Sequence, residues 1–258
     1  MVVQLSQTPS KQAQPTVTWE ALPPTYHLPD DPVENQQQPL LAAALTDALG
    51  ANQRISPEML VVSNFGLVAT VNQKIVVKAP DWLYVPRAHP IAEGTIRRSY
   101  TPNLEGEPVA IVMEFLSDEE GGELSVRSTP PYGKLYFYEQ ILQVPTYVTY
   151  DPYQLALEVR QLQAGAYTVQ VANDQGRFYL PELDLWLGLW RGDRLGQTMH
   201  WLRWWDNDGN LLLWSAEQAE QERQRAEQER QRAEQERQRT ETLAARLREL
   251  GIDPDQVD

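Results

Sequence analysis

Apolar residues recur at helical spacing in two segments of the chain. The first follows a typical helix start at residues 31–34, where an acidic residue, a proline and a glutamate stand in order. Its apolar face consists of Leu40, Leu41, Ala44, Leu45, Ala48 and Leu49. Gly50 is expected to end this helix, and Pro39 could kink or restart it. The second predicted helix runs from Tyr132 to Gln143, just before Pro145.

Short runs rich in β-branched residues, separated by Asn, Gly and Pro, predict strands along the rest of the body. They lie at residues 60–62, 67–71, 75–77, 82–85, 110–116, 147–150, 155–162 and 167–172. The run at 110–116 is almost continuously apolar, as in a strand that is buried on both faces. Residues 86–107 predict a polar loop. The pattern as a whole predicts an α/β fold, with a mixed β-sheet core flanked by helices.

The last part of the chain carries an internal repeat. A heptad of Ala, Glu, Gln and Arg starts at Ala219, Ala226 and Ala233, and all four residue types favour helix. We expect one continuous charged helix over about 217–250, on the order of 50 Å long. A coiled coil needs bulky residues at two positions per heptad, so self-association through the repeat should be weak. A leucine stripe at 243, 247 and 250 could still attach a second copy or a protein partner.

These patterns divide the chain into four segments. Residues 1–29 are polar and proline-rich and predict a flexible lead-in, and residues 30–214 form the body. The charged helix occupies 215–250, and 251–258 form a C-terminal tail.

Composition and charge narrow the possible functions. The chain has no cysteine, which excludes disulfides and thiolate zinc sites. No apolar run is long enough to span a membrane, and the N-terminus has no apolar signal core, so we expect a cytoplasmic protein without membrane contact. The net charge of −14 argues against a protein that coats DNA non-specifically, since such proteins are usually basic. An enzyme with a small, locally basic or metal-charged site is still compatible with this charge.

Four polar residues are candidates for chemistry, and each also has a plain structural interpretation. Glu114 lies within an apolar strand, where an unpaired carboxylate would cost several kcal/mol, unless it faces solvent at the strand end. Asp81 follows Pro80 and could simply form a turn. Lys134 lies beside the apolar face of its helix and could extend its ammonium to solvent. Capping of the first helix could by itself explain Glu34.

In this order, the four residues resemble the Uma-type family of putative restriction endonucleases, within the PD-(D/E)XK nuclease superfamily. The similarity covers roughly residues 30–190. It rests on four sequence segments: 79–85 (APDWLYV), 111–117 (IVMEFLS), 133–138 (GKLYFY) and 144–147 (VPTY). It implies a restriction-endonuclease-like fold over residues 30–214. It further implies that Asp81 and Glu114 hold a divalent metal, that Lys134 is the catalytic lysine, and that Glu34 is the helix glutamate.

The sequence departs from the superfamily pattern at one position. Leu116 stands two residues after Glu114, where the superfamily has its lysine, so the lysine has to come from the helix that contains Lys134. We expect Lys134 to point toward Asp81 and Glu114, whose carboxylates we expect to lie roughly 3–6 Å apart on neighbouring strands. Oxygen ligands of this kind select Mg²⁺ or Mn²⁺.

The leading hypothesis is a Mg²⁺-dependent endonuclease that hydrolyses phosphodiester bonds in DNA. One alternative is a non-catalytic protein-interaction module on a nuclease-like fold, which the acidic charge and the displaced lysine favour. A weaker alternative is a metal-dependent hydrolase acting on a small phosphoester.

Overall fold

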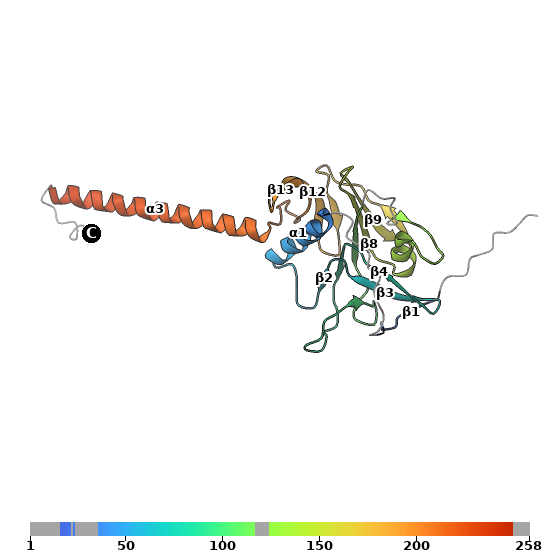
Figure 1. Cartoon of the computed structure of the whole chain (residues 1–258). Helices are drawn as coiled ribbons and strands as arrows, with labels where there is room; N and C mark the ends of the chain where they lie inside the picture. Colours follow the sequence, from blue (N-terminus) through green and yellow to red (C-terminus); the bar gives the residue numbers. More distant parts are fainter. Residues whose placement is uncertain (1–15, 22, 24–35, 117–123, 250–258) are drawn as a thin grey trace, which may run out of the picture. The chain divides into compact units, whose positions relative to one another are not determined.

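The computed structural model describes residues 16–21, 23, 36–116 and 124–249 (Figure 1). The chain forms two compact units, Met1–Leu212 and Leu213–Asp258. The first unit holds the sheets and the two shorter helical segments, and the second contains the long helix α3, Ser215–Glu249. The predicted mixed α/β architecture with a long C-terminal helix is confirmed.

A six-stranded mixed sheet forms the centre of the first unit. Its strand order is β10-β9-β8-β7-β5-β2. The bounds are β2 Leu60–Val62, β5 Trp82–Val85, β7 Ile111–Phe115, β8 Thr146–Asp151, β9 Ala156–Gln163 and β10 Ala166–Val169. Strands β7 and β8 pair in parallel, and the other neighbours pair antiparallel. All six strands begin within two residues of the predicted positions, and β10 ends earlier than predicted.

Two smaller sheets complete the unit. One consists of β1 (Val17–Thr18), β3 (Gly66–Val71), β4 (Lys74–Lys78) and β6 (Ser99–Tyr100). The other consists of β11 (Phe178–Leu180), β12 (Leu185–Arg194) and β13 (Gln197–Trp205). The two-residue strands β1 and β6 pair with β3 and were not predicted, because neither has enough residues to show a period.

Three of the hairpins have two-residue turns in which both central residues have positive φ. The turns are Asn72-Gln73, Ala164-Gly165 and Leu195-Gly196. Positive φ at both central residues is typical of the two-residue hairpin turn whose twist matches the twist of the flanking strands. These turns fix the register of β3 with β4, β9 with β10, and β12 with β13.

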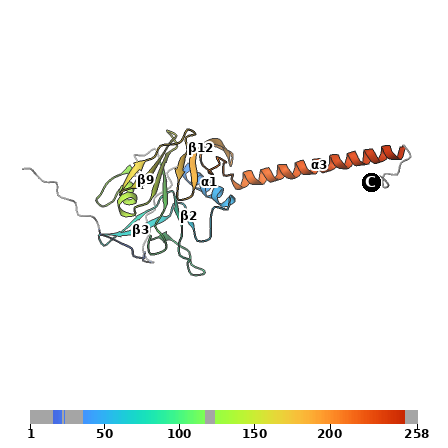
Figure 2. The same cartoon turned by 180° about the vertical axis from the view of Figure 1, so that it is seen from behind.

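Helix α1, Gln37–Ala51, covers one face of the central sheet together with β13 (Figures 1 and 2). Its predicted apolar residues from Leu41 to Leu49 are buried. The Trp82 indole donates to the Thr46 hydroxyl at 3.0 Å, which ties β5 to this helix. Pro39 lies in the first turn, where its missing N–H breaks no helical hydrogen bond, so the helix continues through it. The predicted helix start at 31–34 lies outside the described residues.

The second predicted helix differs from the expectation. Instead of one α-helix over 132–143, the chain forms a short α-helix, α2 (Lys134–Tyr136), that continues as a π-helical turn, η2 (Phe137–Ile141). Tyr132 and Gly133 lie outside it, because the backbone of Gly133 is extended and the helix begins only at the next residue. The wider turn buries Phe137, Tyr138 and Ile141 in the core on the other face of the central sheet.

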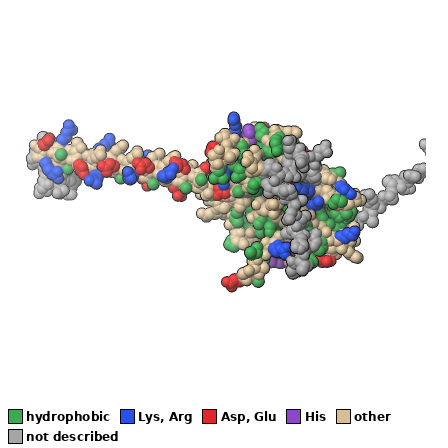
Figure 3. Space-filling model, in the orientation of Figure 1, with side chains coloured by type: hydrophobic (Ala, Val, Ile, Leu, Met, Phe, Trp, Pro, Cys, Tyr) green, Lys and Arg blue, Asp and Glu red, His purple; other side chains and the backbone are tan. Residues whose placement is uncertain are grey.

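Helix α3 confirms the predicted charged helix over the residues that the structure describes. None of its described side chains is buried, and Figure 3 shows Arg and Glu side chains interspersed along it. Leu250, the last residue of the predicted leucine stripe, lies outside the described residues. In the described part of the chain, no helix has both the length and the apolar character that crossing a bilayer requires.

Candidate nuclease-like site on strands β5 and β7

The two predicted acidic residues meet where β5 and β7 lie side by side. Trp82 pairs with Met113, and the same register continued by one residue places Asp81 opposite Glu114. Opposite residues on antiparallel strands project from the same face of the sheet. The amide of Phe115 donates to Oδ2 of Asp81 at 2.6 Å, so the carboxyl group of Asp81 reaches across to β7.

Glu114 is the buried centre of this site, with only 1% of its surface exposed. The Tyr138 hydroxyl donates to Oε1 of Glu114 at 2.8 Å, and Nζ of Lys134 lies 3.2 Å from Oε2. Lys134 and Tyr138 are four residues apart and therefore share one face of the α2–η2 segment. Both carboxylate oxygens of Glu114 thus have a donor from the same helical segment.

Gly133 determines where that helical segment begins. Its amide donates to the Arg127 carbonyl, and a Cβ at this position would collide with the carbonyl oxygen of Ser125. Only glycine therefore allows the preceding loop to pass this close to the helix start. This close approach sets the position of Lys134, the next residue.

Burial dominates the electrostatics of the site. It raises the pKa of Glu114 to about 8, while the nearby Lys134 ammonium lowers that pKa and the Asp81 carboxylate raises it. Burial and the neighbouring Glu114 also raise the pKa of the Tyr138 phenol well above its usual value, so the phenol stays a hydrogen-bond donor.

Gln38 of α1 also contributes to the site, and reasoning from the sequence did not identify it. Its side-chain amide is buried and donates to the Phe115 carbonyl at 2.9 Å. The Phe115 residue is therefore held at its N–H by Asp81 and at its C=O by Gln38. Gln38 stands in a run of three glutamines, and nothing in that run distinguishes it from its neighbours.

The structure brings together three of the four predicted residues: Asp81, Glu114 and Lys134. The predicted direction of Lys134 is confirmed by its contact with Glu114. The predicted separation of the two carboxylates stays a prediction. Glu34, the fourth predicted residue, lies outside the described residues.

The oxygen atoms of Asp81 and Glu114 are suited to a hard divalent cation such as Mg²⁺ or Mn²⁺. Among the described residues, no group of three or more His, Cys, Asp or Glu side chains could hold a metal ion. Mg²⁺ commonly takes only one or two protein carboxylates and completes its shell with water and substrate phosphate. Burial raises the pKa of Glu114 and the Asp81 carboxylate raises it further, and a bound cation would oppose both effects by favouring the charged carboxylate. The donor set therefore fits such an ion.

The chain matches a known protein family. The model of the family Uma2, described as putative restriction endonuclease, matches residues 27–195, a range that contains all four predicted site residues. Helix α3 lies outside this range. No curated protein matches the chain.

Proposed function

The chain belongs to the Uma2 family of putative restriction endonucleases, and from this premise we propose that it is a divalent-metal-dependent endonuclease cleaving phosphodiester bonds in DNA. The observation that carries the proposal is the meeting of Asp81, Glu114 and Lys134. These residues come from two strands and a helix that are distant in sequence. An acid pair that can hold a divalent cation, with an ammonium beside it, is suited to phosphodiester hydrolysis, because both cations can stabilise negative charge on the phosphate.

Asp81 and Glu114 would hold the metal ion. When bound, such a cation neutralises charge that develops on phosphate and makes water a better nucleophile. The hydrogen bond from the Phe115 amide holds the Asp81 carboxyl group in place, and the Gln38 side chain holds the Phe115 carbonyl. The chain therefore positions one acidic residue through backbone contacts and the other through burial in β7.

Lys134 would stabilise negative charge on the substrate. Its side chain is 22% exposed, whereas Glu114 is almost completely buried, so Lys134 lies between the buried acid and solvent. From this position its ammonium can donate to a phosphate oxygen. Tyr138 keeps Oε1 of Glu114 oriented and holds its own proton on the phenol oxygen, since its pKa is raised.

The position of Lys134 also accounts for Leu116. The superfamily pattern has its lysine two residues after the glutamate, on the same strand. Here, Lys134 reaches Oε2 of Glu114 from α2. An ammonium supplied from the helix thus takes the place that the strand lysine has elsewhere.

A second candidate function is a non-catalytic interaction module on the same fold. The observation that favours it is that Lys134 and Tyr138 already satisfy both oxygens of Glu114 by hydrogen bonds. Hydrogen bonds that satisfy both oxygens of Glu114 could stabilise the fold without any catalytic role.

Cleavage of supercoiled plasmid DNA by the full chain, with Mg²⁺ or Mn²⁺ and with EDTA, separates the two candidates. We expect metal-dependent nicking that falls by about 100-fold or more in Asp81→Asn, because the amide keeps an acceptor for the Phe115 N–H but carries no charge. Asp193→Asn, which alters an exposed acid on β12, is the matched control. Absence of cleavage by the wild type, or equal cleavage by Asp81→Asn, would refute the nuclease proposal.

A further inference from the structure

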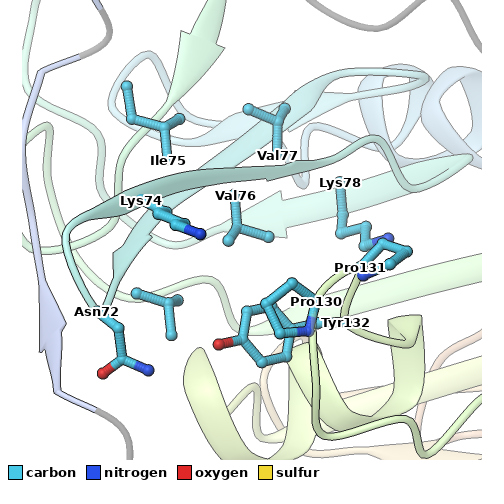
Figure 4. Close-up of a pocket in the computed structure, with 10 residues that line it drawn as sticks. Asn72, Lys74, Ile75, Val76, Val77, Lys78, Pro130, Pro131 and Tyr132 are labelled. Carbon is cyan, nitrogen blue, oxygen red and sulfur yellow. The ribbon is translucent and has the colours of Figure 1, made fainter.

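A groove lies between strand β4 and the segment that leads into α2 (Figure 4). Its volume is about 410 Å³, and its walls are residues 74–78 on one side and 130–132 on the other. In the described part of the chain, β4 pairs only with β3 and is therefore an edge strand.

The side chains of β4 give the groove a mixed character. Figure 4 shows Val76 and Lys78 extending toward the Pro130–Tyr132 segment, while Ile75 and Val77 extend from the opposite face. Lys74 shares the face of Val76 and Lys78, because side chains alternate along a strand. The groove therefore has apolar walls with an ammonium group toward each end of β4.

Positive charge gathers around this groove in a chain that is otherwise strongly acidic. The chain has four lysines and a net charge of −14, and Lys74 and Lys78 line the groove. Arg127 does not line the groove, but its guanidinium donates to the carbonyl of the wall residue Pro130 at 3.1 Å. This concentration of cations points to a ligand with regularly spaced negative charge.

Both walls of the groove lead directly into the candidate site. Lys78 stands three residues before Asp81, and Tyr132 stands two residues before Lys134. Lys74 and Lys78 are about 13 Å apart along the strand, the rise of about four nucleotides in a B-form strand. A polymer whose phosphates follow the groove would thus arrive at Asp81, Glu114 and Lys134.

We propose that this groove binds the phosphodiester backbone of the DNA strand beside the bond that is cut. The inference rests on the proposed nuclease function and extends it to the path of the substrate. An extended peptide added to the edge of β4 is less consistent with the structure, because lysines on an edge strand oppose pairing with another strand. The exposed Pro130 and Pro131 supply apolar surface for sugars and bases.

Salt-dependent binding of fluorescent single- and double-stranded oligonucleotides to the full chain in EDTA tests this path without requiring cleavage. Each lost phosphate contact reduces the slope of log K against log salt by about 0.9 for duplex and about 0.7 for single strands. For Lys74→Gln/Lys78→Gln, we expect a slope reduced by about 1.8 or about 1.4. Between 50 and 200 mM salt, wild-type duplex binding should then weaken about tenfold more than that of the variant.

Arg54→Gln/Arg191→Gln makes the same change in net charge at two exposed arginines outside the groove and is the matched control. A second readout uses the absence of cysteine: a photocrosslinker attached at Lys74→Cys should label DNA, and one at Arg54→Cys should not. An unchanged slope in the lysine variant, an equal change in the control, or no DNA binding by the wild type overturns the groove proposal.

Plasmid cleavage measured in parallel separates this proposal from the nuclease proposal. Cleavage by the wild type with an unchanged salt slope in the lysine variant defeats the groove alone. Lysine-dependent binding without any metal-dependent cleavage defeats the nuclease function and leaves the groove as a DNA-binding surface.

Discussion

Replacing Lys134 by Met tests the network around Glu114 most directly. Methionine keeps an unbranched stem of similar length and removes only the ammonium group. The lost contact is a charge-assisted hydrogen bond of 3.2 Å between a side chain that is 22% exposed and one that is buried. Hydrogen bonds to charged groups contribute about 1.5–3 kcal/mol to stability.

Two features of the site limit the loss. Breaking a fully buried ion pair costs about 3–5 kcal/mol, because the remaining charge is stranded. Here, Glu114 keeps the Tyr138 hydrogen bond, and burial raises its pKa to about 8 even with Lys134 present. At pH 7 the carboxyl group of the variant therefore carries a proton, and no negative charge is stranded. We therefore expect the free energy of unfolding to fall by about 1–2 kcal/mol.

Urea denaturation in EDTA at pH 7 measures this change, with Lys134→Arg as the variant that retains the charge. In a double-mutant cycle, Glu114→Gln combined with Lys134→Met should show a coupling energy of about 1 kcal/mol or more. A coupling below about 0.5 kcal/mol, or equal stability of wild type and Lys134→Met, would mean that the contact does not hold the site together.

Three further predictions concern other parts of the chain. Tyr138→Phe removes the donor to Oε1 of Glu114 and should lower the free energy of unfolding by about 1 kcal/mol, while ring packing is retained; urea denaturation measures it. Burial raises the pKa of Glu182 above its usual value, although the hydrogen bond from the Thr146 hydroxyl partly opposes this. The protonated group therefore stabilises the fold at a pH below its unfolded pKa of about 4.3, and this contribution is lost as the pH rises through the higher pKa of the folded state. Glu182→Gln should flatten that part of the stability–pH curve, and an unchanged curve would contradict the assignment. Removal of residues 217–258 should leave one cooperative melting transition by circular dichroism, since no described side chain of α3 is buried; loss of cooperativity would show that the helix belongs to the core.

Local pattern alone was sufficient for most of the elements. Strand β5 was predicted at its observed bounds, because Pro80 and a run of β-branched and aromatic residues define it. The heptads that start at Ala219 predicted α3, since helix propensity and pairs of charges act between residues three or four apart. The pairing of β1 and β6 with β3 could not be predicted in the same way, because two residues show no period.

The same distinction between local pattern and tertiary structure applies to the candidate site. Glu114 could be found from the sequence because a carboxylate inside an apolar strand requires a partner. Which donors satisfy it was decided only by tertiary structure: the close approach at Gly133 positions Lys134, and the wide turn after Tyr136 positions Tyr138. In the same way, α1 places Gln38 against the Phe115 carbonyl. Contacts of this kind join residues 20 to 77 positions apart. They depend on which strands become neighbours and on how the helices pack against the sheet, and the hydrophobic pattern within a single element specifies neither.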